Sequence, residues 1–219
     1  MRRPGRFLSS SVGKKTFMAF TGLGLVGFLI VHLAGNLTMF AGGDEAFNAY
    51  AEKLESYGWL LHAAEIGLLA LFAVHVALAL RLARENAAAR PEGYRVRASS
   101  GAKTLGSSSM LVTGLIVGVF VVIHVVDFRI PKLAGEIDDL ALAVRARLAS
   151  PVGALIYLAG VLVLAVHLSH ALQSAAQTLG GHHPRWTPFL RHGARALAVL
   201  LALGFAAFPV LLFLGGGPS

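Results

Sequence analysis

Five long apolar stretches dominate the pattern of hydrophobic and polar positions along the chain. They cover residues 16–40, 59–80, 104–126, 152–172 and 196–214. A hydrocarbon layer about 30 Å thick is crossed by about 20 apolar residues in a helix, so each stretch is long enough to span a membrane. Short segments of alternating polarity, which are typical of a transmembrane barrel, are not evident, nor is an internal repeat. The pattern predicts an all-α integral membrane protein, a single domain over residues 1–219 built as a bundle of five transmembrane helices.

The composition supports a membrane protein and narrows the chemistry. Hydrophobic residues make up 56% of the chain and charged residues 14%, with a mean hydropathy of +0.69. These values exclude a disordered chain, a soluble enzyme and a nucleic-acid-binding protein, despite the net charge of +8. The chain has no cysteine, which excludes a thiolate zinc site, a protein-held iron–sulfur cluster and c-type haem attachment. Any redox centre must therefore be held by nitrogen or oxygen ligands.

The basic residues predict the orientation in the membrane. Fourteen lysines and arginines fall in the N-terminal segment and in the second and fourth connections, against five in the first and third connections. The positive-inside rule therefore predicts a cytoplasmic N-terminus and a C-terminus outside. Both outer connections are amphipathic, and Asp44 is placed to cap the first of them. We expect ordinary connecting helices that cover the bundle, with helices lying flat among the lipid headgroups as the alternative.

Four of the five stretches carry a histidine well inside, at His32, His75, His124 and His167. An ionisable side chain inside a membrane is costly and is therefore a candidate functional residue. A single such histidine is more often a buried residue held by a hydrogen bond. One histidine in each of four helices favours a shared role, provided that their depths agree.

The depths of the histidines agree in pairs. A helix rises about 1.5 Å per residue, and His32 follows Lys15 by seventeen residues on an outward-going helix, which places it about 25 Å from the inner surface. His124 also lies near the outer end of its stretch, whereas His75 and His167 lie near the inner ends of theirs. The spacing predicts an outer pair, His32 with His124, and an inner pair, His75 with His167, about 15 Å apart along the membrane normal.

Two imidazoles that face each other in an apolar bundle suit a haem. Zinc normally takes four ligands, and two histidines at each level leave it underligated. A porphyrin supplies four nitrogens of its own, and imidazole is a good ligand for iron. We therefore expect two b-type haems, each with both axial positions filled by histidine. Such centres transfer electrons and leave no open site for oxygen or substrate on the iron.

Two other features are candidates with an ordinary structural alternative. Gly153 and Gly160 lie seven and fourteen residues before His167, on nearly the same face of the helix, and could give clearance to a haem. Close packing of helices explains such glycines equally well. His62 and Glu65 lie three residues apart at the outer end of the second stretch, hence on one face. They could bind and protonate a quinone head group, or simply form a partly solvated helix end.

Several motifs resemble one known family over nearly the whole chain. They are KKTFMAFTG at 14–22, HLAGNL at 32–37, FNAYA at 47–51, HLSH at 167–170 and QTLG at 177–180. Together they are similar to the single-chain, five-helix, two-haem cytochrome b membrane anchor of bacterial succinate dehydrogenase and fumarate reductase (complex II). In that family one histidine from each of the first four helices ligates haem b, the first helix pairing with the third and the second with the fourth. The four histidines of this chain match those positions.

The resemblance implies a setting that composition does not show. A flavoprotein and an iron–sulfur subunit dock on the cytoplasmic face, and the anchor passes electrons between the iron–sulfur subunit and a menaquinone-like quinone. No residue of this chain acts on succinate itself. The expected location is the bacterial cytoplasmic membrane, in contact with lipid, with oligomers of the whole complex as a further expectation. Some two-haem relatives carry a glutamate near the fourth-helix ligand that is proposed to move protons, and here Ala165 lies two residues before His167.

Two other functions compete with this interpretation. A histidine-lined metal or proton transporter would use the same residues, but transporters are usually built from internal repeats with broken helices, and neither is evident in the sequence. A different di-haem cytochrome b, such as the membrane anchor of a hydrogenase, would share the chemistry and differ in its partner.

Overall fold

A computed structural model describes residues 10–89, 105–181 and 185–215, and for residues 105–108 it describes the backbone alone. The long helices are α2 (Ser11–Asn36), α4 (Trp59–Ala88), α5 (Leu105–His124), α8 (Pro151–Thr178) and α9 (Thr187–Leu214). A π-helical turn, η1 (Val125–Arg129), and the short α6 (Ile130–Leu133) extend α5. Five helical segments are long and apolar enough to cross a membrane, and the described ranges contain no strand. The predicted all-helical class and the number of spans are confirmed.

The ends of the helices differ from the predicted ends of the apolar stretches. The element α2 ends at Asn36, but Leu37 keeps helical φ/ψ, and the helical path breaks only at Gly43 (φ 75°), inside α3 (Thr38–Glu55) and close to the predicted end at residue 40. At the other end of the bundle, α4 and α8 continue past residues 80 and 172 to Ala88 and Thr178. An apolar pattern marks only the part of a helix that lies in hydrocarbon, and polar residues with good helix propensity continue it beyond.

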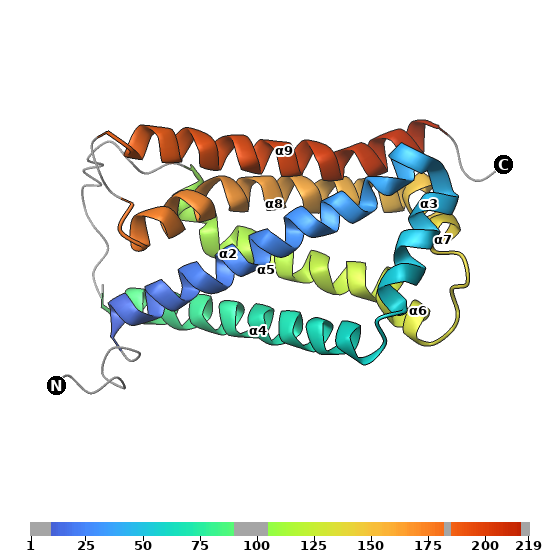
Figure 1. Cartoon of the computed structure of the whole chain (residues 1–219). Helices are drawn as coiled ribbons and strands as arrows, with labels where there is room; N and C mark the ends of the chain where they lie inside the picture. Colours follow the sequence, from blue (N-terminus) through green and yellow to red (C-terminus); the bar gives the residue numbers. More distant parts are fainter. Residues whose placement is uncertain (1–9, 90–104, 182–184, 216–219) are drawn as a thin grey trace.

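The long helices lie side by side and alternate in direction (Figure 1). Helix α8 is central and packs against α2, α5 and α9, while α4 packs against α2 and only slightly against α5. The short helices α3, α6 and α7 (Leu140–Ala149) gather at one end of the bundle, which is the predicted outer end. Helix α2 begins at the opposite end from the one at which α9 finishes.

The buried core runs along α8 and leaves α4 at the edge. One cluster, which includes Val26, Leu168 and Leu201, joins α2, α8 and α9. A second cluster packs α3 and α7 onto the ends of α8 and α9. In contrast, Leu82 is the single buried residue of α4. Ion pairs connect both ends of α4 to the bundle, one between Lys14 and Glu85 (2.5 Å) and the other between Arg129 and Glu65 (2.7 Å).

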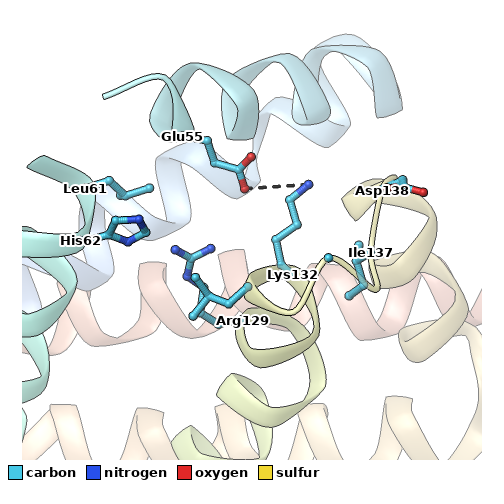
Figure 2. Close-up of a pocket in the computed structure, with 9 residues that line it drawn as sticks. Glu55, Leu61, His62, Arg129, Lys132, Ile137 and Asp138 are labelled. Atoms are coloured by element: carbon cyan, nitrogen blue, oxygen red, sulfur yellow. Dashed lines mark ion pairs between the residues drawn. The ribbon is translucent and has the colours of Figure 1, made fainter. Parts of the chain in front are cut away.

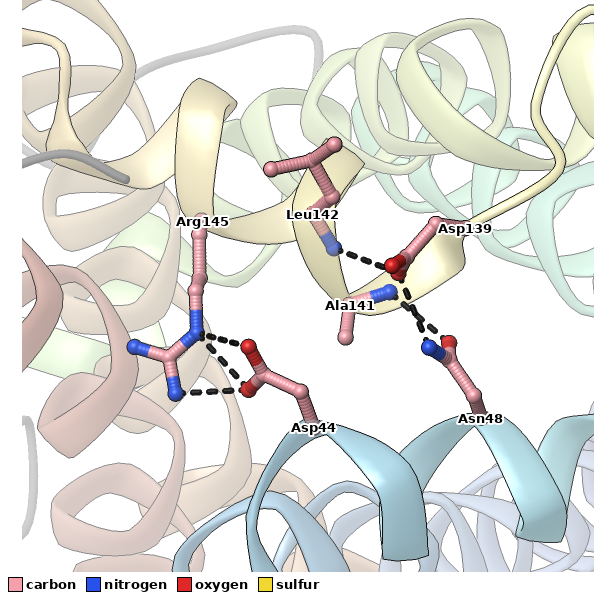
Figure 3. A network of polar contacts seen from close by, with 6 residues as sticks. All are labelled: Asp44, Asn48, Asp139, Ala141, Leu142 and Arg145. Atoms are coloured by element: carbon pink, nitrogen blue, oxygen red, sulfur yellow. Dashed lines mark hydrogen bonds and ion pairs between the residues drawn. The ribbon is translucent and has the colours of Figure 1, made fainter. Parts of the chain in front are cut away.

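Helices α3 and α7 are cross-linked by two groups of polar contacts (Figure 3). The Arg145 guanidinium donates to both carboxylate oxygens of Asp44, with Nε 2.7 Å from each. Asn48 donates to Asp139 (2.8 Å) and accepts from the Ala141 N–H (3.0 Å). Asp44 thus forms an interhelical ion pair in addition to standing at the start of the amphipathic segment. The connections are helices that pack together over the end of the bundle, in agreement with the first of the two expectations.

Asp139 caps α7 and predicts a pH dependence. Its carboxylate accepts from the Leu142 N–H (2.8 Å) and from Asn48, and these bonds hold the pKa of Asp139 below its usual value of 3.8. A carboxyl pKa that is depressed in the folded state gives stability at neutral pH that is lost as the pH falls through the folded-state pKa. Asp139→Asn keeps a capping oxygen and removes the charge.

We expect D139N to unfold about 1–4 °C below the wild type at pH 7 and at nearly the same temperature at pH 3. Thermal unfolding in detergent, followed by circular dichroism, measures both temperatures. Asp138→Asn, the neighbouring substitution, is the control and should show no such convergence. A gap that stays constant between pH 7 and pH 3 contradicts the assignment.

Candidate functional site

The four predicted histidines come from four different helices and form two levels. His32 lies on α2, His75 on α4, His124 at the end of α5 and His167 on α8, and all four side chains are half-buried. The rings of His32 and His124 have centroids 5.7 Å apart and planes at 82°. The structure therefore brings together the two residues of the predicted outer pair, and the meeting of His75 with His167 stays a prediction.

Aromatic rings surround the outer pair. His32 stacks on Phe28 (centroids 5.2 Å apart) and lies 5.9 Å from Phe205. The ring centroid of His124 lies 5.4 Å from that of Phe128 and 6.0 Å from that of Tyr157. This apolar lining suits a neutral imidazole and a flat apolar ligand.

A polar network adjoins the outer pair, and the sequence analysis did not anticipate it. Asp127 lies in the π-helical turn directly after His124 and accepts hydrogen bonds from Arg147 (2.8 Å) and from the Tyr157 hydroxyl (2.9 Å). Single π-helical turns occur often at functional sites because they redirect side chains. Here the turn places a carboxylate beside the ring that contacts His124.

Threonine and glycine hold each histidine of the inner pair. The hydroxyl of Thr21 lies 3.0 Å from Nδ1 of His75, and that of Thr113 lies 3.2 Å from Nδ1 of His167. In both cases the residue that follows the threonine is a glycine, and a Cβ added there would lie 3.2 Å from Cε1 of the same histidine. The two histidines of the inner pair thus have the same surroundings.

This likeness exposes an internal repeat of 92 residues, which corrects the expectation that the chain has none. His124 and His167 each lie 92 residues after His32 and His75. The same offset relates further identical residues: Met18 and Met110, Thr21 and Thr113, Gly22 and Gly114, Leu23 and Leu115, Phe28 and Phe120, Ala73 and Ala165, and Val74 and Val166. The identities are spread thinly over long apolar helices, so the repeat becomes visible only when the contacts are compared.

The backbone supports the repeat. Gly43 and Gly135, also 92 residues apart, both adopt positive φ, at 75° and 73°, a conformation that strongly favours glycine. Each half therefore contains a helix, a connection that turns at an equivalent glycine, and a returning helix. Each level of the site takes one histidine from each half, as expected when an approximate two-fold axis runs along the bundle between the halves.

The donors fit a ligand that needs only two bonds from the protein. Among the described residues no three histidine or acidic side chains gather around one point. A macrocycle that supplies four nitrogens needs one imidazole on each face. His32 and His124, whose ring centroids are 5.7 Å apart, would be the residues that hold such a group at the outer level.

The glycines Gly153 and Gly160 make room for protein atoms in this structure. A Cβ at Gly160 would lie 2.4–2.6 Å from the ring of Phe120, and one at Gly153 would lie 1.8 Å from the carbonyl oxygen of Arg147. These contacts fit the close-packing alternative, and a role beside a haem stays a prediction. The glycines that face the imidazoles are Gly22 and Gly114.

His62 lines a pocket at the outer end of α4 (Figure 2), and Glu65 lies three residues further along the same helix. The pocket has a volume of about 330 Å³ and is lined by His62, Arg129 and Lys132 among others. Glu65 lies 3.5 Å from His62 and forms a shorter ion pair with Arg129, at 2.7 Å, while Lys132 pairs with Glu55 at 3.8 Å. The sequence analysis found the first two residues and missed Arg129, which is distant from them in the chain.

Comparisons of the chain with family models, with curated proteins and with solved structures find no match.

Packing around Gly160 gives a test of the outer site. Gly160→Ala would place a methyl group against the ring of Phe120. The centroid of that ring lies 5.3 Å from the centroid of Tyr157 and 6.4 Å from that of His124. We expect a loss of about 1–3 kcal/mol of unfolding free energy from overpacking. Gly118→Ala on α5, where a Cβ meets nothing within 4 Å, is the control and should stabilise the helix by up to about 1 kcal/mol. Unfolding in detergent measures both, and equal effects would contradict the packing described here.

Proposed function

We propose that the chain is the di-haem cytochrome b anchor of a complex II, a succinate:quinone oxidoreductase or quinol:fumarate reductase. One observation carries the proposal: one histidine from each half of an internal repeat meets its counterpart at the outer level, and the two inner histidines have equivalent threonine and glycine neighbours. His32 with His124, and His75 with His167, would be the axial ligands of an outer and an inner haem. When bound, haem supplies a one-electron couple, and the chain holds it between neutral imidazoles in an apolar bundle.

The paired histidines suit electron transfer across the membrane. Two protein ligands at each level would leave no position for a substrate. The outer level lies near the ends of α2 and α5, and the inner level lies farther from that end of the bundle, on α4 and α8. The chain would thus connect a partner on the inner surface to a quinone in the membrane. This role makes it an electron-transfer subunit of an oxidoreductase, with no part in the chemistry of succinate.

The resemblance of the motifs around His32 and His167 to the complex II anchor family supports the choice of partners. The partners we propose are a flavoprotein and an iron–sulfur subunit at the basic end of the bundle, which the distribution of lysine and arginine places in the cytoplasm. The bacterial cytoplasmic membrane is the corresponding location.

For the quinone we propose the pocket beside His62 and Glu65 at the outer end of α4. The pocket combines an imidazole, a guanidinium and an ammonium group with the apolar side chains of Leu61, Leu133 and Ile137. A quinone head group needs hydrogen-bond donors for its carbonyl oxygens and a proton acceptor when the quinol is oxidised. Glu65, held by Arg129, lies 3.5 Å from His62.

The internal repeat gives some support to the transporter alternative, because transporters are often built from repeats. The histidines argue against it, since in the described part of the chain no carboxylate joins them to form a group of three or more ligands. A hydrogenase anchor remains an alternative that shares the haem chemistry.

The haem content tests the proposal. The purified protein should show a reduced-minus-oxidised spectrum of b type, with two haems per chain by the pyridine haemochrome assay. His124→Ala should remove one haem, because the outer level loses a ligand, and leave the inner one. His192→Ala, at an exposed histidine of α9, is the control and should keep both. A zinc-loaded protein without haem would favour the transporter, and loss of both haems from a folded H124A protein would contradict the pairing.

A second experiment tests the quinone pocket. In the purified complex, Glu65→Gln should lower quinol oxidation at least tenfold, because it removes the proton acceptor, with both haems still present. Glu52→Gln, on the outer-end helix α3, is the matched control and should leave the rate unchanged. A rate in E65Q equal to that of the wild type would place the quinone elsewhere.

A further inference from the structure

Two threonines inside the bundle have no role in the function described so far. Thr21 and Thr113 are 7% and 8% exposed, and with Lys14 they are the buried polar or charged residues among the described side chains. Both face a histidine of the inner level across a helix interface, Thr21 from α2 to α4 and Thr113 from α5 to α8. A buried hydroxyl in an apolar span is costly unless it is hydrogen-bonded, so these contacts call for an explanation.

The hydrogen atoms in these contacts can be assigned. The hydroxyl of Thr21 lies 3.1 Å from the Met18 carbonyl oxygen, and that of Thr113 lies 3.0 and 3.2 Å from the carbonyl oxygens of Ser109 and Met110. A carbonyl oxygen only accepts, so the single hydroxyl hydrogen is donated to the helix backbone. When the hydroxyl hydrogen is on the backbone carbonyl, the imidazole is the donor to the threonine oxygen, through Nδ1–H.

We propose that Thr21 and Thr113 are positioning residues that fix His75 and His167 in the Nδ1–H tautomer. In a neutral imidazole with its hydrogen on Nδ1, Nε2 keeps a free lone pair. The threonine thus anchors one side of the ring and leaves a metal-binding nitrogen on the other. The consequence for haem rests on the proposed function, whereas the tautomer itself does not.

The glycine after each threonine belongs to the same device. Gly22 and Gly114 let the imidazole approach the helix. A Cβ added at either glycine would lie 3.2 Å from Cε1 of the histidine, which is shorter than about nine in ten contacts that Cβ atoms make in proteins. A threonine–glycine pair thus fits one histidine edge in each half of the repeat. The outer pair instead has aromatic neighbours, among them Phe28 beside His32 and Phe128 beside His124.

An acceptor for Nδ1–H makes an imidazole a stronger donor to a metal and fixes the ring orientation. A hydroxyl that donates to a carbonyl is itself a better acceptor, because hydrogen bonds in a chain polarise one another. Loss of the acceptor should weaken binding of the more highly charged ferric state more than that of the ferrous state. The inner haem should therefore become easier to reduce.

The experiment uses the full chain and replaces each threonine in turn. Thr21→Val and Thr113→Val keep the shape of the side chain and remove the hydrogen-bond acceptor. Thr21→Ser and Thr113→Ser keep the acceptor. The control, Thr16→Val, removes an exposed hydroxyl of α2 that bonds to the Val12 carbonyl oxygen. The inner haem is identified as the one lost in His75→Ala. In the valine variants we expect about a tenfold loss of preference for the ferric state. This corresponds to an upward shift of about 59 mV in the reduction potential of the inner haem, a one-electron couple. The low-spin electron paramagnetic resonance g values should change as well. The serine variants and T16V should retain the wild-type values.

Two readouts keep this proposal separate from the proposed function. Inner-haem potentials and g values that are unchanged in both folded valine variants would overturn the positioning role while leaving a di-haem anchor intact. The imidazole ¹⁵N shifts of the haem-free chain report the tautomer directly. They should show Nδ1–H for His75 and His167 in the wild type and a mixture in the valine variants. A wild type that binds no haem would contradict the proposed function, but the ¹⁵N shifts would still identify the tautomer. An Nε2–H form of His75 and His167 would overturn the proposal about the threonines.

Discussion

Four imidazoles inside an apolar bundle are the main constraint on this structure, because burying their polar ring nitrogens without hydrogen-bond partners costs free energy. Each ring has a donor and an acceptor nitrogen that hydrocarbon cannot satisfy, so the helices must bring suitable partners to matching depths. At the inner level these partners are two buried threonine hydroxyls, on Thr21 and Thr113. At the outer level His32 and His124 lie together among aromatic rings. Under the proposed function, the nitrogens that remain would bind a metal that brings its own equatorial donors.

The internal repeat explains why the histidines meet in these pairs. Two copies of a helix–connection–helix unit place equivalent residues at equivalent depths, and at the outer level His32 meets its own counterpart, His124. The copies have since diverged in their packing. Helix α8 buries seven residues and contacts α9, whereas its counterpart α4 buries one. Helix α9 has no equivalent and covers one side of the bundle, and the ion pairs at Glu85 and Glu65 hold α4 at its two ends.

The sequence predicted the helical class, the five spans and the grouping of the histidines by depth, because hydropathy and helical rise are local properties of the chain. The contacts across helices could not be predicted in the same way. Thr21 reaches His75 over 54 residues, and Arg129 reaches Glu65 over 64, so nothing nearby in the chain marks them. Gly160 was a candidate for haem clearance or for close packing, and only the structure shows that Phe120 of α5 fills the space beside it. The 92-residue offset was present in the sequence and could have identified both threonines, since each precedes a glycine at the same repeat position.

A density map of the protein purified in its native lipids tests the central claim most directly. Electron cryo-microscopy at a resolution that separates side chains should show two flat densities within the bundle, each with an imidazole on either face, one between His32 and His124 and one between His75 and His167. Imidazoles of a pair in direct contact with nothing between them, or any of the four rings turned toward lipid, would contradict the account.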